Sequence, residues 1–180
     1  MRQIEITHAN FFLDWLNSSE ALDFSIDSSH KEEDTHVDVV AVSSKLGKSI
    51  LIQNVAFRGE GLVYSDNMTV SGNPELIKLL PKFKAVLVPT QYDKKKSIQD
   101  YILKKEKKYP ANLVNNLVLL IEATVPSTNP DELSAYFPNG LETKFKGIYF
   151  VQLPIPMTLT DDKWGQSGFI FPLKNLDIRK

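Results

Sequence analysis

The chain has 180 residues, of which 42% are hydrophobic and 24% are charged, and its formal net charge is −1. This balance is typical of a folded soluble domain and gives no overall attraction to nucleic acid or anionic lipid. Cysteine is absent, which excludes disulfide scaffolds, thiolate zinc sites, iron–sulfur clusters and cysteine nucleophiles. The length predicts a single α/β domain over residues 1–180.

The apolar segments are short. Glu5 and Asp14 interrupt the apolar residues near the N-terminus, so no signal-peptide core is present. Runs such as 117–121 are far below the roughly 20 residues that span a bilayer. We therefore expect a cytoplasmic protein with no membrane partner.

The first predicted elements are a helix and a β-hairpin. Apolar residues recur at helical spacing over Asn10–Leu22, with Asn10 as the N-cap, and the acidic, serine-rich stretch 23–35 predicts a surface loop. Val37–Val42 and Ile50–Phe57 are rich in β-branched residues and flank SSKLGKS, whose glycine favours a tight turn. The sequence therefore predicts a helix, a strand, a turn and a second strand, in that order.

The middle of the chain predicts short elements and one long helix. Residues 58–61 (RGEG) indicate a turn, and 62–65 (LVYS) a short strand. Pro74–Leu80 favours a short helix and Ala85–Val88 a short buried strand. Tyr92–Tyr109 predicts a lysine-rich helix with a narrow apolar stripe, which Pro110 ends.

The last third predicts the centre of the sheet. Leu117–Glu122 has the length and composition of a buried strand, a short helix follows at 131–137, and Gly147–Leu153 is another strand. A strand–helix–strand unit makes the two strands parallel, and Phe169–Phe171 favours an edge strand. The fold class is thus α/β, a mixed β-sheet with helices on both faces, with Leu117–Glu122 between the hairpin and Gly147–Leu153.

Specific catalytic and phosphate-binding motifs are absent. The chain contains no GxxxxGK[ST], HExxH, GxSxG or GxGxxG. His30 lies near Glu32, Glu33 and Asp34, which are possible metal ligands, but no histidine pair has the spacing of a metal site. A solvated acidic loop is the simpler interpretation.

One pair of polar strand residues has the pattern of a nuclease. Asp38 opens the first hairpin strand and Gln53 lies in the second, which resembles the core of the PD-(D/E)XK (restriction-endonuclease-like) family over about half the chain. The resemblance implies that Asp38 and Gln53 bind a divalent metal, here Mg²⁺, and that Glu20 of the preceding helix adds a catalytic carboxylate. Glu60 or phosphate oxygens are the alternatives that could complete the metal site. Val55 stands where the family carries its lysine.

Hairpin geometry determines whether that pair meets. A two-residue turn at Leu46 and Gly47 makes Asp38 and Gln53 diagonal neighbours on one face of the sheet. They would then share a metal ion, or Asp38 merely begins a strand while Gln53 makes a local hydrogen bond. Both interpretations stay open at the level of sequence.

Charge is unevenly distributed along the chain. Residues 1–36 have a net charge of −6, whereas residues 75–109 hold ten lysines and a net charge of +6. Near Tyr92 and Tyr101, which are expected to be exposed aromatic groups, the lysines predicted to contact a nucleic-acid backbone are Lys94, Lys95, Lys96, Lys104, Lys105, Lys107 and Lys108. A solvated helix face is the alternative.

These observations lead to one functional hypothesis and one alternative. The hypothesis is a non-catalytic binding or regulatory protein that needs no cofactor and engages a protein or nucleic-acid partner through a polar surface. The alternative is a Mg²⁺-dependent nuclease of PD-(D/E)XK type with an incomplete motif, so the sequence leaves open whether the protein is an enzyme.

Overall fold

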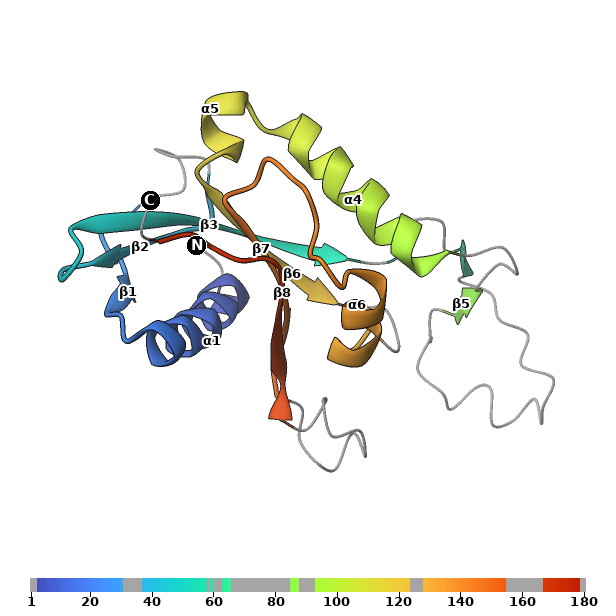
Figure 1. Ribbon diagram of the computed structural model, residues 1–180, viewed down its shortest axis with the longest axis horizontal. Helices are drawn as coiled ribbons and strands as arrows, with labels where there is room; N and C mark the ends of the chain where they lie inside the picture. The colour runs from blue at the N-terminus through green and yellow to red at the C-terminus, as the bar shows by residue number, and fades with distance from the viewer. Residues whose placement is uncertain are drawn as a thin grey trace.

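The computed structural model describes residues 3–30, 37–57, 59, 63–65, 85–87, 93–123, 128–154 and 167–178 (Figure 1). Its elements are α1 (Gln3–Glu20), β1 (Phe24–Ile26), β2 (Val39–Ser43), β3 (Lys48–Phe57), β4 (Val63–Ser65), β5 (Ala85–Leu87), α4 (Lys94–Lys108), α5 (Ala111–Val114), β6 (Leu117–Ala123), α6 (Pro130–Tyr136), β7 (Gly147–Gln152) and β8 (Phe169–Lys174).

Six strands form one mixed sheet in the order β1-β2-β3-β6-β7-β8. Strand β6 is parallel to both of its neighbours, β3 and β7. The other pairs of adjacent strands are antiparallel. This confirms the predicted α/β class, the parallel strand–helix–strand unit and the position of β6 between the hairpin and β7. Strands β4 and β5 pair separately in a two-stranded sheet.

The pleat of the sheet divides the apolar residues between two clusters. Leu119 of β6 belongs to the cluster that contains Ile98 and Ile102 of α4, while its neighbour Leu120 belongs to the cluster that contains Phe12 and Leu16 of α1. Successive strand residues point to opposite faces, so α1 and α4 cover opposite faces of the sheet (Figure 1).

The first helix is longer than predicted, and a strand follows it. Helix α1 begins at Gln3 rather than Asn10, because His8 and Ala9 are buried against the sheet and extend its packed face. Strand β1 lies in the stretch predicted as a loop. The side-chain amide of Asn17 accepts a hydrogen bond from Phe24 N (2.9 Å) and donates to Phe24 O (2.8 Å), which aligns β1 beside β2.

The hairpin turn has four residues, not the two predicted. Ser43 pairs with Lys48, which leaves residues 44–47 in the turn. The carboxylate of Asp23, from outside the hairpin, accepts hydrogen bonds from the Ser43 hydroxyl and from Lys45 N (3.1 Å). Gly47, at φ +61°, closes the turn with a bond from its N–H to Ser43 O (3.0 Å).

The lysine-rich helix has nearly the predicted bounds. Asp93 caps α4, its side chain accepting from Lys96 N (3.0 Å), and the helix ends at Lys108, with Tyr109 as its C-cap before Pro110. The predicted helix Pro74–Leu80 lies outside the described residues, and strand β8 is an edge strand, as predicted. Among the helices described, none is long and apolar enough to cross a membrane.

Candidate functional site

Asp38 and Gln53 meet, as the hairpin predicted, in a direct hydrogen bond. The four-residue turn shifts the register by two residues, which keeps both side chains on the same face. The buried Asp38 Oδ2 accepts from Gln53 Nε2 (2.6 Å) and from Asn54 N (2.7 Å), just beyond the point where β2 stops pairing with β3. The carboxylate thus supplies an acceptor where the strand ladder ends.

The surroundings of Asp38 do not fit Mg²⁺. Gln53 turns its amide nitrogen, a donor, toward the carboxylate, and Val55 packs against an apolar cluster. Glu20 is exposed at the far end of α1, roughly 22 Å along the helix axis from Glu5, whose carbonyl contacts Asn54. Mg²⁺ needs several oxygen ligands, and within the described ranges no three His, Cys, Asp or Glu residues gather around a common point.

His30 also has a structural role. Its Nε2 lies 3.1 Å from Val37 O, which ties the two ends of the intervening segment together. Glu32, Glu33 and Asp34 lie outside the described residues. The predicted absence of a dedicated site at His30 therefore stays a prediction.

The seven predicted lysines of α4 fall into two groups. Lys94 pairs with Glu132 of α6 (2.8 Å), and the Lys105 ammonium lies over the ring of Tyr101, 5.2 Å from its centroid. Lys94 attaches α4 to α6, whereas the contact between Lys105 and Tyr101 lies within α4. The other five are exposed and form what we call the basic face: Lys95, Lys96, Lys104, Lys107 and Lys108.

Tyr101 does not belong to the basic face. It is buried and donates its hydroxyl hydrogen to Ala56 O (2.9 Å), so it offers no ring for base stacking. The expectation of an exposed aromatic at this position is wrong, because Tyr101 lies on the stripe that packs against the sheet. Tyr92 lies outside the described residues.

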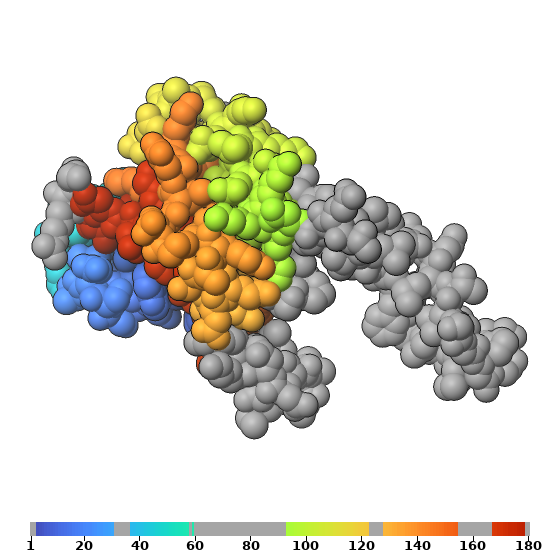
Figure 2. Space-filling model, turned by 45° about the vertical axis from the view of Figure 1, so that its right-hand side comes forward, coloured from blue at the N-terminus to red at the C-terminus, as the bar shows by residue number. Residues whose placement is uncertain are grey.

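Helix α4 is held along its length. Ile98 and Ile102 are buried against the sheet, and Glu106 accepts hydrogen bonds from the Thr143 hydroxyl and from Lys144 N (2.9 Å). Figure 2 shows the green atoms of α4 as a continuous strip on the surface, beside the orange atoms of α6 and the loop before β7. The basic face is therefore presented by a fixed helix.

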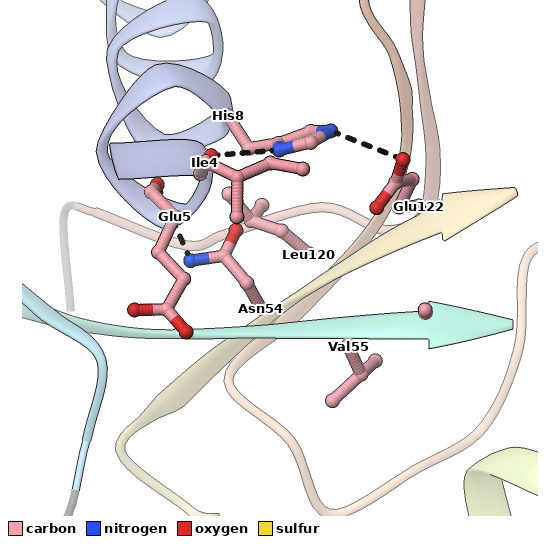
Figure 3. A pocket seen from close by; sticks show the side chains of 8 residues that line it. Ile4, Glu5, His8, Asn54, Val55, Leu120 and Glu122 are labelled. Atoms are coloured by element: carbon pink, nitrogen blue, oxygen red, sulfur yellow. Dashed lines mark hydrogen bonds and ion pairs between the residues drawn. The ribbon is translucent and has the colours of Figure 1, made fainter. Parts of the chain in front are cut away.

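Sequence reasoning missed a small pocket with a mixed polar and apolar lining between α1 and the ends of β3 and β6 (Figure 3). Its volume is about 160 Å³. We call it the His8 pocket, and it is lined by Ile4, Glu5, His8, Asn54, Val55, Ala56, Leu120 and Glu122.

The buried imidazole of His8 orders this pocket. Nδ1 lies 2.9 Å from Ile4 O, and Nε2 lies 4.0 Å from Glu122 Oε1. Asn54 Nδ2 approaches Glu5 O at 3.5 Å, while the Glu5 carboxylate points away from the pocket (Figure 3). The sequence signal for the pocket is the position of His8, one helical turn before Phe12, which a helix predicted to begin at Asn10 leaves out.

Comparison with known proteins gives no assignment. No protein-family model matches the chain, and no curated protein or solved structure matches it.

Proposed function

We propose that this is a non-catalytic binding protein that contacts the phosphate backbone of a nucleic acid through the basic face of α4. The observation that supports this is the separation of the lysines by role. Lys94 pairs with Glu132 of α6 and Lys105 lies over the Tyr101 ring, whereas the five lysines of the basic face are exposed. Asp100 is the exposed acidic residue between them within α4, so positive charge dominates.

The length of the basic face suits a duplex backbone. Lys96 and Lys107 are separated by roughly 16 Å along the helix axis, about five steps of duplex nucleic acid. Lysine ammonium groups bind phosphates as point charges and carry no bidentate base readout. Binding should therefore be sensitive to salt and largely independent of base sequence, because contacts to the backbone carry no sequence information. We place this interaction in the cytoplasm.

The test is a salt titration of binding to a fluorescent DNA duplex, followed by anisotropy. In a plot of log Kd against the logarithm of the salt concentration, each phosphate bound should contribute about 0.9 to the slope. The double variant Lys104→Gln/Lys107→Gln should weaken binding and flatten the slope by about 0.9 for each phosphate that is no longer neutralised. The matched control is Lys45→Gln/Lys48→Gln in the exposed hairpin turn region, which removes the same charge and should leave the slope unchanged.

Two results would contradict the proposal. One is no detectable binding at low salt, and the other is an equal loss of affinity in the α4 and hairpin variants, which would indicate attraction by overall charge alone. In either case a protein partner becomes the better hypothesis for the basic face.

The PD-(D/E)XK nuclease alternative has less support, because the Asp38 carboxylate accepts two hydrogen bonds and Glu20 lies at the other end of α1. The contact between Asp38 and Gln53 on adjacent strands is what favours it. Incubation with DNA and RNA in the presence of Mg²⁺ distinguishes the two proposals. Cleavage that disappears in Asp38→Asn would establish the nuclease, and intact substrate supports a binding protein.

A further inference from the structure

The His8 pocket presents hydrogen-bond acceptors that face one another. A backbone carbonyl only accepts, so Ile4 O requires a proton on His8 Nδ1, and in the neutral ring Nε2 is then an acceptor. Nε2 faces the Glu122 carboxylate, a second acceptor, at 4.0 Å. A single nitrogen donor placed between two acceptors at this separation would lie within hydrogen-bonding distance, about 2.9 Å, of both.

Asn54 adds a third acceptor. The amide nitrogen of Asn54 lies near Glu5 O. This contact defines the orientation of the amide, so Asn54 Oδ1 points away from Glu5 O. This Oδ1 atom is buried and has no hydrogen-bond partner among the residues that the structure describes. Buried polar atoms in folded proteins nearly always have a partner, so an unsatisfied acceptor that lines a pocket calls for a donor from a ligand.

The charge and shape of the pocket restrict that ligand. Glu122, with 39% of its side chain exposed, places a negative charge at the opening, and the described residues that line the pocket include no lysine or arginine. Ile4 and Leu120 add apolar wall. A volume of about 160 Å³ is close to that of cavities that admit a molecule of roughly six heavy atoms.

We propose that the His8 pocket binds a primary ammonium group carried on a short alkyl chain. An ammonium has three N–H donors and no acceptor, which matches Glu122 Oε1, Asn54 Oδ1 and His8 Nε2. The alkyl chain contacts Ile4 and Leu120. A divalent metal is a poorer match, because of the two carboxylates drawn in Figure 3 that of Glu122 points toward His8 and that of Glu5 points away.

The test is an NMR titration of the full chain with n-butylammonium chloride at neutral pH. The ring signals of His8 and the side-chain amide signals of Asn54 should shift saturably, with a millimolar Kd. 1-Butanol, similar in shape but uncharged and without the ammonium group, should cause no saturable shift. Glu122→Gln should weaken n-butylammonium binding about tenfold or more, since it removes a charge-assisted hydrogen bond.

Glu20→Gln is the matched control, because it removes an exposed carboxylate of α1 far from the pocket and should leave the Kd unchanged. Equal shifts with 1-butanol, no shift with n-butylammonium, or an unchanged Kd in a folded Glu122→Gln variant would overturn the proposal. Because the pocket lies on the sheet face opposite α4, these outcomes do not depend on nucleic-acid binding.

Two further probes identify the source of the ammonium group. Nα-acetyl-lysine methylamide presents the chain as a protein would, and cadaverine presents it as a free diamine. Both contain the required chemistry. Binding of the lysine derivative as tight as that of n-butylammonium would assign a lysine of a protein partner, whereas binding of cadaverine alone would assign a small free amine.

Discussion

At the scale of single residues, Asp38 has a structural role that its position alone does not reveal. Its carboxylate accepts from the side chain of Gln53 and from the backbone of Asn54 while almost fully buried. The negative charge also acts at a distance. Burial, and after it the Asp38 carboxylate, raises the pKa of Tyr109 above its usual value. Asp38 thus joins β2 and β3 where the hydrogen-bonded ladder between them ends.

Replacing Asp38 with alanine should lower the free energy of unfolding by roughly 2–3 kcal/mol, because the hydrogen bonds to a charged acceptor disappear and buried donors are left unpaired. Asp38→Asn retains one carbonyl acceptor and should be less destabilising. Urea unfolding followed by circular dichroism measures both. Equal stability of wild type and Asp38→Ala would show that the carboxylate contributes nothing to the fold.

At the scale of elements, α4 depends on polar contacts at its ends and along its side. The Asp93 side chain caps the first turn, Lys94 reaches Glu132 of α6, and Glu106 holds the loop before β7. The buried stripe of the helix has few residues, among them Ile98 and Ile102. These contacts keep the basic face in one orientation, so the cap affects the proposed binding surface.

We expect Asp93→Ala to destabilise the protein by about 1 kcal/mol, since an exposed helix N–H loses its acceptor. Asp93→Asn keeps a capping oxygen and should cost only a few tenths. Thermal denaturation gives the stability, and amide hydrogen exchange in residues 94–98 reports fraying of the first turn. Unchanged exchange in Asp93→Ala would mean that the cap does not hold the helix start.

At the scale of the whole molecule, Tyr149 joins three parts of the chain. It lies in β7, its ring packs against Phe12 (4.8 Å between centroids) and Trp15 (5.6 Å) of α1, and its hydroxyl oxygen accepts from Leu176 N (2.7 Å). Burial raises the pKa of Tyr149 to about 12. Folding thus keeps the phenol protonated at a pH where the unfolded chain has lost the proton.

This raised pKa predicts the alkaline limit of stability. The unfolded phenol ionises near pH 10, so the contribution of the neutral side chain is fully present below that pH and is lost as the pH rises from about 10 to about 12. The loss attributable to Tyr149 is up to about 2–3 kcal/mol. Tyr149→Phe should be somewhat less stable at neutral pH and should decline less over this range. Urea unfolding at pH values from neutral to alkaline compares the two, and parallel curves would contradict the prediction.

Several features of the protein were determined by local sequence. The apolar run of β6 marks a strand buried on both faces, and Pro110 ends α4 wherever the helix packs. The meeting of Asp38 and Gln53 was also predictable, because an error of two residues in the register leaves both on the same face. Each of these follows from periodicity or from constraints between near neighbours in the chain.

Other features depend on residues that are distant in sequence. The four-residue hairpin turn requires Asp23, β1 requires the amide of Asn17, and the His8 pocket requires Glu122. The structure alone separates the lysines of α4 by role, because Lys94 pairs with Glu132, which is distant in sequence. Local patterns specify which residues are apolar and how often they recur. Tertiary packing alone determines which buried polar atoms find a partner and which, like Asn54 Oδ1 within the described part of the chain, do not.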